Sequence, residues 1–273
     1  MTPYSPCPVC GNRERHIEYE LKAGNVVACT GCSLVSMVGV DTTELVRCCY
    51  DENYYRRGDS PCVAGYFDYF GAEAKDRRAT AETLALAIRS LAPRARRVLD
   101  LGCGGGYLVS ALHEQGIEAV GADTSAYAIG RAVAAESGRF VHGGADGAEI
   151  SALAPYDSIA MIDVIEHLPD PVTTLRQVTA LMRPGGLILV LTPRYGGRLQ
   201  AEQGSEYVHF ARDHMYYFTA QTLRAVLARG TKSARIQIDD VLHMLDGLRI
   251  EVPRAMERKY SMDRESMIAC VHA

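Results

Sequence analysis

The stretch that decides the predicted fold of this chain is Val98-Leu99-Asp100-Leu101-Gly102-Cys103-Gly104-Gly105-Gly106. It starts as an apolar strand and runs through a glycine-rich turn into a helical pattern from Tyr107 to Gln115. Glycines gather at a strand end where a ligand lies directly on the backbone, because a Cβ atom there would hold the ligand away. The stretch therefore predicts a ligand-binding loop, with an ordinary strand-to-helix turn as the alternative.

The spacing of the glycines indicates which kinds of ligand the loop could bind. A dinucleotide loop reads Gly-x-Gly-x-x-Gly and places a helix N-terminus against a pyrophosphate. Here the acid Asp100 comes first, and the glycines follow at Gly102, Gly104 and Gly106. The pattern therefore departs from that of a loop built around a pyrophosphate.

The composition indicates a globular chain with a full core. Hydrophobic residues make up 48% of the 273 residues and charged residues 23%, which suits one sizeable domain and a small one. No apolar run approaches the roughly 18 to 20 residues that cross a bilayer. The start Met1-Thr2-Pro3-Tyr4 also lacks the features of a signal peptide. We therefore expect a cytoplasmic protein with no membrane partner.

The charge pattern argues against a nucleic-acid partner. The formal net charge is −4, and the basic clusters at 94–97 and 254–259 are short and far apart in the sequence. We interpret each cluster as a solvated face. Nine cysteines in a cytosolic chain favour thiols and metal ligation over a disulfide framework.

Four of the cysteines form two Cys-x-x-Cys pairs, Cys7 with Cys10 and Cys29 with Cys32. Two such turns supply four thiolates in a tetrahedral arrangement, which suits zinc, and the 18 residues between the pairs fit a zinc ribbon. A closed four-thiolate shell leaves no open position, so the predicted zinc is structural. Unligated cysteines and a redox pair are the alternatives.

Three regions are expected: a zinc ribbon at 1–45, a helical connector or cap at 46–93, and a main domain at 94–273. In the connector, the aromatic stretch 48–55 is interpreted as either a cover over a ligand or a packed edge between the two other regions. Leu84, Ile88 and Leu91 share one face of an amphipathic helix predicted from Ala79 to Leu91.

The main domain alternates predicted strands with predicted helices, as in a Rossmann-like doubly wound α/β sheet. After the first strand, further strands are expected at 118–122, 139–142, 156–162 and 187–191, with helices at 126–137, 171–182 and 219–228. Two last strands are expected at 234–238 and 267–272.

Acidic residues follow three of these strands. Asp123 follows the second strand, Asp146 the third and Asp163 the fourth. Ligands of such sheets bind at the carboxyl ends of the strands, and an acid at the position of Asp123 can accept hydrogen bonds from ribose hydroxyls. Each acid alone could be a helix cap, but all three together favour a ligand site.

These motifs resemble a known family. Val98 to Pro193 is similar to class I S-adenosylmethionine (SAM) methyltransferases, and 163–171 with Arg183-Pro184-Gly185-Gly186 resembles the branch related to ubiquinone-biosynthesis methyltransferases. With the four cysteines and the late stretch 213–219, the chain resembles bacterial methyltransferases that carry an N-terminal zinc ribbon. Many of these act in natural-product, sugar or surface-polysaccharide pathways.

The resemblance implies SAM as cofactor and assigns seven residues to it. The loop glycines Gly102, Gly104 and Gly106 would line the methionine part, and Asp100 would position the loop. Asp123 would hold the ribose, Asp146 would approach the adenine amino group, and Asp163 would lie near the sulfonium.

Histidines are the natural proton acceptors near neutral pH for an alcohol acceptor. Three are candidates: His167 after the fourth strand, and His209 and His214 after the fifth. Each could instead have a capping or packing role.

The predicted function is methyl transfer to a small molecule, with O-methylation favoured. One alternative is a SAM-binding or catalytically degenerate subunit whose zinc ribbon docks another protein; a homo-oligomer is also open. An RNA methyltransferase is a weaker alternative, because residues 1–45 contain more acids than bases.

Overall fold

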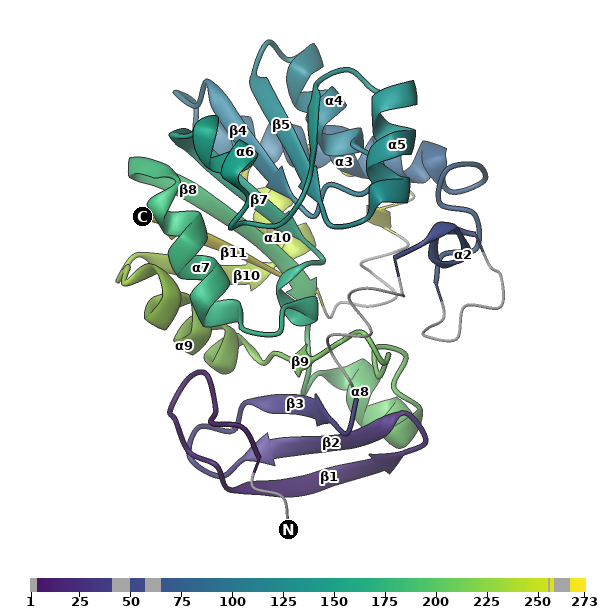
Figure 1. The fold of residues 1–273 in the computed structure, drawn as a ribbon, viewed down its shortest axis with the longest axis vertical. Helices are drawn as coiled ribbons and strands as arrows, with labels where there is room; N and C mark the ends of the chain where they lie inside the picture. The colour runs from purple at the N-terminus through teal and green to yellow at the C-terminus, as the bar shows by residue number, and fades with distance from the viewer. Residues whose placement is uncertain (1–3, 41–49, 57–64, 255, 258–265) are drawn as a thin grey trace.

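The computed structural model describes residues 4–40, 50–56, 65–254, 256–257 and 266–273. The chain forms two sheets: a large one of seven strands and a small one of four. The large sheet carries helices on both faces, and the small sheet lies below it in Figure 1.

The large sheet has the strand order β10-β11-β8-β7-β4-β5-β6. The strands from β8 to β6 pair in parallel, whereas β11 pairs antiparallel with both β8 and β10. Their bounds are β4 (Arg97–Leu101), β5 (Glu118–Asp123), β6 (Arg139–His142), β7 (Tyr156–Ile162), β8 (Met182–Pro193), β10 (Ile236–Asp240) and β11 (Ser266–His272).

Alternate residues along each strand enter two separate cores. Val98 packs with one helix layer and Leu99 with the other, as expected for a strand buried on both faces. The first layer is α3 (Ala74–Leu91), α4 (Tyr107–Glu114), α5 (Ala126–Ala135) and α10 (Val241–Gly247); the second is α6 (Ala148–Ala152), α7 (Pro171–Ala180) and α9 (Ala220–Thr231). The predicted doubly wound α/β fold is therefore confirmed.

The small sheet is antiparallel, with the order β1-β2-β3-β9. The chain start supplies three of its strands, β1 (Arg15–Leu21), β2 (Gly24–Cys29) and β3 (Val35–Val38). Its fourth strand, β9 (Tyr216–Tyr217), comes from the far part of the chain. The small sheet is thus completed by a segment that follows β8.

Several boundaries differ from the prediction. The helix expected at 171–182 ends at Ala180, and the Arg183-Pro184-Gly185-Gly186 stretch belongs to β8 rather than to a helix end. Strand β1 in the four-cysteine region was not predicted, because its residues are mostly exposed and show no apolar run. The short elements α2 (Glu52–Tyr55), η1 (Ile165–His167), α8 (Arg198–Gln203) and η2 (Gly204–Glu206) were not predicted.

The two C-terminal strands expected from the sequence are present, and α10 lies between them. Asp240 caps this helix by accepting from the backbone N–H groups of Leu242 and His243. In the described part of the chain, none of the helices is both long and apolar enough to cross a membrane.

Candidate active site

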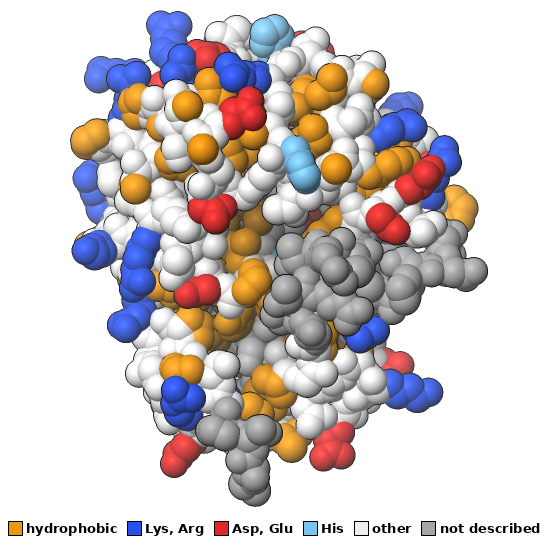
Figure 2. Space-filling model, in the orientation of Figure 1, with side chains coloured by type: hydrophobic (Ala, Val, Ile, Leu, Met, Phe, Trp, Pro, Cys, Tyr) orange, Lys and Arg blue, Asp and Glu red, His pale blue; other side chains and the backbone are white. Residues whose placement is uncertain are grey.

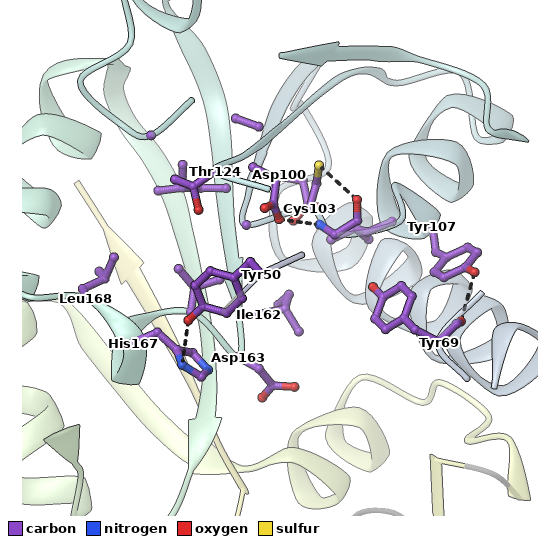
Figure 3. A pocket seen from close by; sticks show the side chains of 18 of the residues that line it. Tyr50, Tyr69, Asp100, Cys103, Tyr107, Thr124, Ile162, Asp163, His167 and Leu168 are labelled. Atoms are coloured by element: carbon purple, nitrogen blue, oxygen red, sulfur yellow. Dashed lines mark hydrogen bonds between the residues drawn. The ribbon is translucent and has the colours of Figure 1, made fainter. Parts of the chain in front are cut away.

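One large cavity lies at the carboxyl ends of β4, β5 and β7 and has a volume of about 880 Å³. Pockets for drug-sized ligands range from about 300 to 1,000 Å³, so this one is large enough for two small molecules side by side. Six of the seven residues assigned to SAM from the sequence line it: Asp100, Gly102, Gly104, Asp123, Asp146 and Asp163. The topology thus brings together acids from four strand ends, of which Asp100 and Asp163 are labelled in Figure 3.

Asp123 ties the glycine loop to the end of β5. Its Oδ2 accepts from the Gly104 backbone N–H at 2.8 Å, and its Oδ1 accepts from the Ser125 N–H at 2.8 Å. Each carboxylate oxygen keeps a further lone pair for hydroxyl donors. Gly104 has φ +51°, and a Cβ atom there would meet the Tyr69 hydroxyl, so this position requires glycine.

Asp100 lies buried at the floor of the cavity. Burial raises its pKa to about 7, and the charge of Asp123 adds to this rise. The pKa of Asp123 is also raised by burial, although the N–H groups of Ser125 and Gly104 oppose the rise. Two acids that share one apolar site favour a ligand that is cationic or rich in hydroxyl donors.

Gly106 lies outside the cavity lining, although the sequence placed it beside the methionine part. It caps α4 with φ +78°, and a Cβ atom there would meet the Phe140 ring and Ala132. The missing side chain therefore makes room for helix packing against β6. The Gly-x-Gly-x-Gly pattern alone cannot distinguish a glycine needed for close packing from a glycine that contacts a ligand.

Asp146 and Asp163 line the cavity from the carboxyl ends of β6 and β7, which lie on either side of β4 and β5. Asp146 is exposed in the turn after β6, next to Gly143 and Gly144. Asp163 directly follows β7 and has φ +53°, a backbone conformation that residues other than glycine seldom adopt. Strained residues of this kind cluster at functional sites.

An aromatic wall covers the glycine loop, and the sequence foresaw only part of it. It consists of Tyr50, Tyr54, Tyr55, Tyr66 and Tyr69, all of which line the cavity. Tyr50, Tyr54 and Tyr55 belong to the stretch expected to lie over a ligand or at a packed edge, and they do line the cavity; Cys48 and Cys49 of that stretch lie outside the described residues.

Arg77 was missed in the sequence, and it is the one Lys or Arg among the described residues that line the cavity. Its guanidinium carbon lies 4.1 Å from the Tyr66 ring centroid and 3.9 Å from the Tyr69 centroid, while Glu73 accepts from it at 2.5 Å. Stacked between two rings, this cation is held beside the glycine loop. A basic residue in α3 carries no sequence signal of this placement.

His167 is the one histidine among the described residues that line the large cavity. Its Nδ1 lies 2.9 Å from the Asp213 carbonyl oxygen, 3.5 Å from Asp213 Oδ2 and 3.4 Å from the Tyr50 hydroxyl. Figure 3 shows the Tyr50 hydroxyl directed at the His167 ring, within the wall of the cavity. These contacts fix the ring orientation through Nδ1.

His214 and His209 lie behind His167 rather than in the large cavity. Both line a separate space of about 10 Å³, hardly enough for one water molecule. The ring of His214 lies 4.6 Å from that of His167 between centroids, and 5.9 Å from that of His209. Burial, together with these two histidines, lowers the pKa of His214 well below its usual value. The sequence could not rank the three histidines by their access to a ligand.

Glu166 adds a buried carboxylate beside these rings. Its Oε2 accepts from the Thr192 hydroxyl at 2.9 Å, while Oε1 is buried without a hydrogen-bond partner among the described residues. Burial raises its pKa to about 7. Glu166, His167 and His214 each place a ligand atom within 4.8 Å of the other two, so this trio can hold a divalent cation.

The four predicted cysteine ligands come together at one end of the small sheet. The Sγ atoms of Cys7 and Cys32 lie 3.5 Å apart, and those of Cys10 and Cys29 lie 3.4 Å apart. Thiolates about 2.3 Å from a zinc ion lie about 3.8 Å apart in a tetrahedron. All four Sγ atoms lie within 4.8 Å of one another, so the residues fit a structural zinc ion.

The fold and the cavity define an α/β protein that binds its ligand at the carboxyl ends of a doubly wound sheet. A family model described as a methyltransferase domain matches residues 72–229. The chain therefore belongs to this family of methyltransferase domains, which confirms the resemblance to class I SAM-dependent methyltransferases.

Sequence relatives include two ubiquinone biosynthesis O-methyltransferases. That of Aromatoleum aromaticum is 34% identical over 120 residues, which cover 41% of this chain and 51% of that protein. That of Paracidovorax citrulli is 29% identical over 161 residues, 55% of this chain and 68% of that protein. The chain thus matches about half to two thirds of the length of these relatives.

Solved structures show the same fold. The plantazolicin methyltransferase BpumL, solved with S-adenosylhomocysteine (SAH), has a TM-score of 0.56 at 16% identity and covers 85% of this chain and 97% of its own. A chain from the complex between the Haloferax volcanii Trm112 methyltransferase activator and a methyltransferase has a TM-score of 0.53 at 19% identity, covering 74% of this chain and 95% of its own.

Proposed function

We propose that this protein transfers the methyl group of SAM to a hydroxyl group of a small-molecule acceptor. The observation that carries the proposal is a single cavity lined by the glycine loop, four strand-end acids and His167. Family membership supports SAM as the methyl donor. The names of the ubiquinone O-methyltransferase relatives support oxygen as the methyl acceptor.

SAM supplies an activated methyl group on a sulfonium, and the residues of this chain hold and align the reactants. Arg77 stands beside the glycine loop and would pair with the methionine carboxylate, because it is the one Lys or Arg among the described residues that line the cavity. Asp123 would accept from the ribose hydroxyls, Asp146 would accept from the adenine amino group, and Asp163 would lie near the sulfonium. The buried acids favour a positively charged ligand over a neutral one.

On the acceptor side, His167 is placed to receive the proton of the hydroxyl that is methylated. The Asp213 carbonyl and the Tyr50 hydroxyl hold its Nδ1, which leaves Nε2 as the nitrogen for the acceptor. The His214 ring lies behind this ring, 4.6 Å away between centroids, and His209 in turn stacks on His214.

The tyrosine wall favours an acceptor with an apolar or aromatic body. Tyr54 and Tyr55 are buried, and their ring centroids lie 5.1 Å apart in an edge-to-face contact. Such rings supply large apolar contact area with few polar groups. On the face shown in Figure 2, acidic side chains lie among the Lys and Arg side chains, also over the small sheet, which gives no support to an RNA acceptor.

The test combines binding with methyl transfer. Calorimetry with SAM and SAH should detect binding, and radiolabelled SAM should transfer its methyl group to members of a panel of phenols, hydroxylated natural products and sugar nucleotides. Binding of NADH without binding of SAM would contradict the proposal. Binding of SAM without transfer to any acceptor, alone or with added partner proteins, would favour the degenerate-subunit alternative.

A further inference from the structure

The small sheet is hydrogen-bonded to the wall that carries His167. β3 pairs with β9, and the Met37 N–H donates to the Met215 carbonyl at 3.0 Å. The Met215 N–H in turn donates to the Glu166 carbonyl at 2.8 Å, one residue before His167. Two backbone hydrogen bonds therefore lead from β3 to the turn that presents His167 to the cavity.

Side chains from β1 also hold the part of the chain between β8 and β9. The Tyr195 hydroxyl donates to Glu18 at 2.6 Å, and the Gln200 amide donates to the Tyr19 hydroxyl at 2.8 Å. Tyr19 also packs against Phe210 with ring centroids 5.2 Å apart. The ribbon therefore contacts the segment 206–218, which carries His209, Asp213 and His214, through more than one strand.

The four-cysteine site lies at the turn that sets the position of β3. Cys29 ends β2 and Cys32 lies just before β3, so ligation of both fixes the β2–β3 connection. Cys7 and Cys29 also belong to the same apolar cluster as Val172 of α7 and Phe218. Because a unit this small has little core of its own, a bound metal is what holds its turns in place.

We propose that the zinc ribbon is a scaffold for the acceptor side of the active site, holding the segment 206–218 and the Glu166–His167 turn in position against the cavity. This inference rests on the proposed function only in taking the His167 wall as the acceptor side of the cavity. The glycine loop directly follows β4, and neither β4 nor the neighbouring β5 has a strand partner in the small sheet. Loss of the metal should therefore loosen the His167 wall and leave the glycine loop intact.

Hydrogen exchange of the full chain tests this inference, with zinc bound and after removal by a chelator. Metal analysis should first show about one zinc per chain in the untreated protein. Removal should speed exchange about tenfold or more in peptides that cover 163–168 and 206–218, and change peptides that cover 97–123 less than about twofold. Added zinc should restore the original rates.

Two results would overturn the inference: faster exchange confined to residues 4–40, or an equal increase throughout the chain. The double variant Cys29→Ser with Cys32→Ser gives the same comparison if the chelator fails to strip the metal. Calorimetry of SAH binding on the same samples tests the proposed function separately, because the scaffold can be present in a protein that binds no SAH.

A gentler variant leaves the cysteines untouched. Tyr195→Phe removes the hydroxyl that donates to Glu18, and we expect exchange in 206–218 to rise about two- to fivefold. Tyr156→Phe is the matched control, because its hydroxyl donates to the Ile150 carbonyl inside the large domain. An identical exchange pattern in the two variants would contradict a specific tie between the ribbon and the His167 wall.

Discussion

The two sides of the cavity are built in different ways. The glycine loop and Asp123 belong to neighbouring parallel strands and lie close together in the sequence. The His167 wall joins Tyr50, His167 and Asp213 with β3 of the small sheet, segments that are far apart in the chain. A local motif can therefore specify the donor side, whereas the acceptor side depends on how distant segments pack.

The largest effect is expected for replacement of His167, which should change the acceptor side of the cavity and leave the donor side intact. His167→Ala should lower kcat about 10²- to 10⁴-fold, the usual contribution of a positioned base, while SAM affinity stays nearly unchanged. The measurement is steady-state kinetics with an acceptor found in the panel, together with calorimetry. A variant that turns over at full speed would remove His167 from the reaction.

The converse change acts on the donor side. Asp123→Ala should weaken SAM binding about ten- to a hundredfold, because hydrogen bonds to a charged acceptor contribute roughly 1.5 to 3 kcal/mol each. Calorimetry measures the change, and Asp157→Ala is the control, since Asp157 is an acid outside the cavity. Equal SAM affinity in the two variants would contradict the ribose role of Asp123.

A substitution at His214 tests whether its contact with the His167 ring contributes to turnover. His214→Ala should lower kcat only about three- to tenfold, because the ring touches His167 and not the large cavity. His214→Gln keeps a polar side chain of similar reach and should recover part of the loss. A loss as large as that of His167→Ala would assign the proton transfer, or a shared cation, to both rings.

Asp100 is expected to act on stability. Its folded pKa of about 7 lies above the unfolded value, so its ionisation costs stability progressively as pH rises from about 4 through 7. Asp100→Asn removes this cost and should raise the unfolding free energy of the unliganded protein by up to about 4 kcal/mol at pH 8, with little change at pH 4. Denaturant titrations at the two pH values measure it. A variant that is less stable at pH 8 would contradict the raised pKa.

The local sequence was enough to predict most of the elements on the donor side of the cavity. The strands at 139–142 and 156–162 lie where their apolar residues placed them: β7 is buried along most of its length, and the edge strand β6 buries Val141. The acids follow because the carboxyl ends of parallel strands meet at one edge of the sheet. The spacing of the four cysteines likewise predicted their cluster, since two residues between the members of each pair bring both thiolates into one turn.

Other features depended on contacts that no local pattern carries. Gly106 packs against Phe140 and lies outside the cavity lining, and Arg77 lines the cavity beside the rings of Tyr66 and Tyr69. Tertiary packing places His167 in the wall of the large cavity and His209 and His214 at a separate small space. β9 completes the ribbon sheet from a segment almost two hundred residues away. The sequence by itself determined the sheet, its glycine loop and its cysteine cluster, because these depend on neighbours along the chain. Only the tertiary structure decided which side chains line the cavity opposite the glycine loop, because burial and pairing across distant segments set their positions.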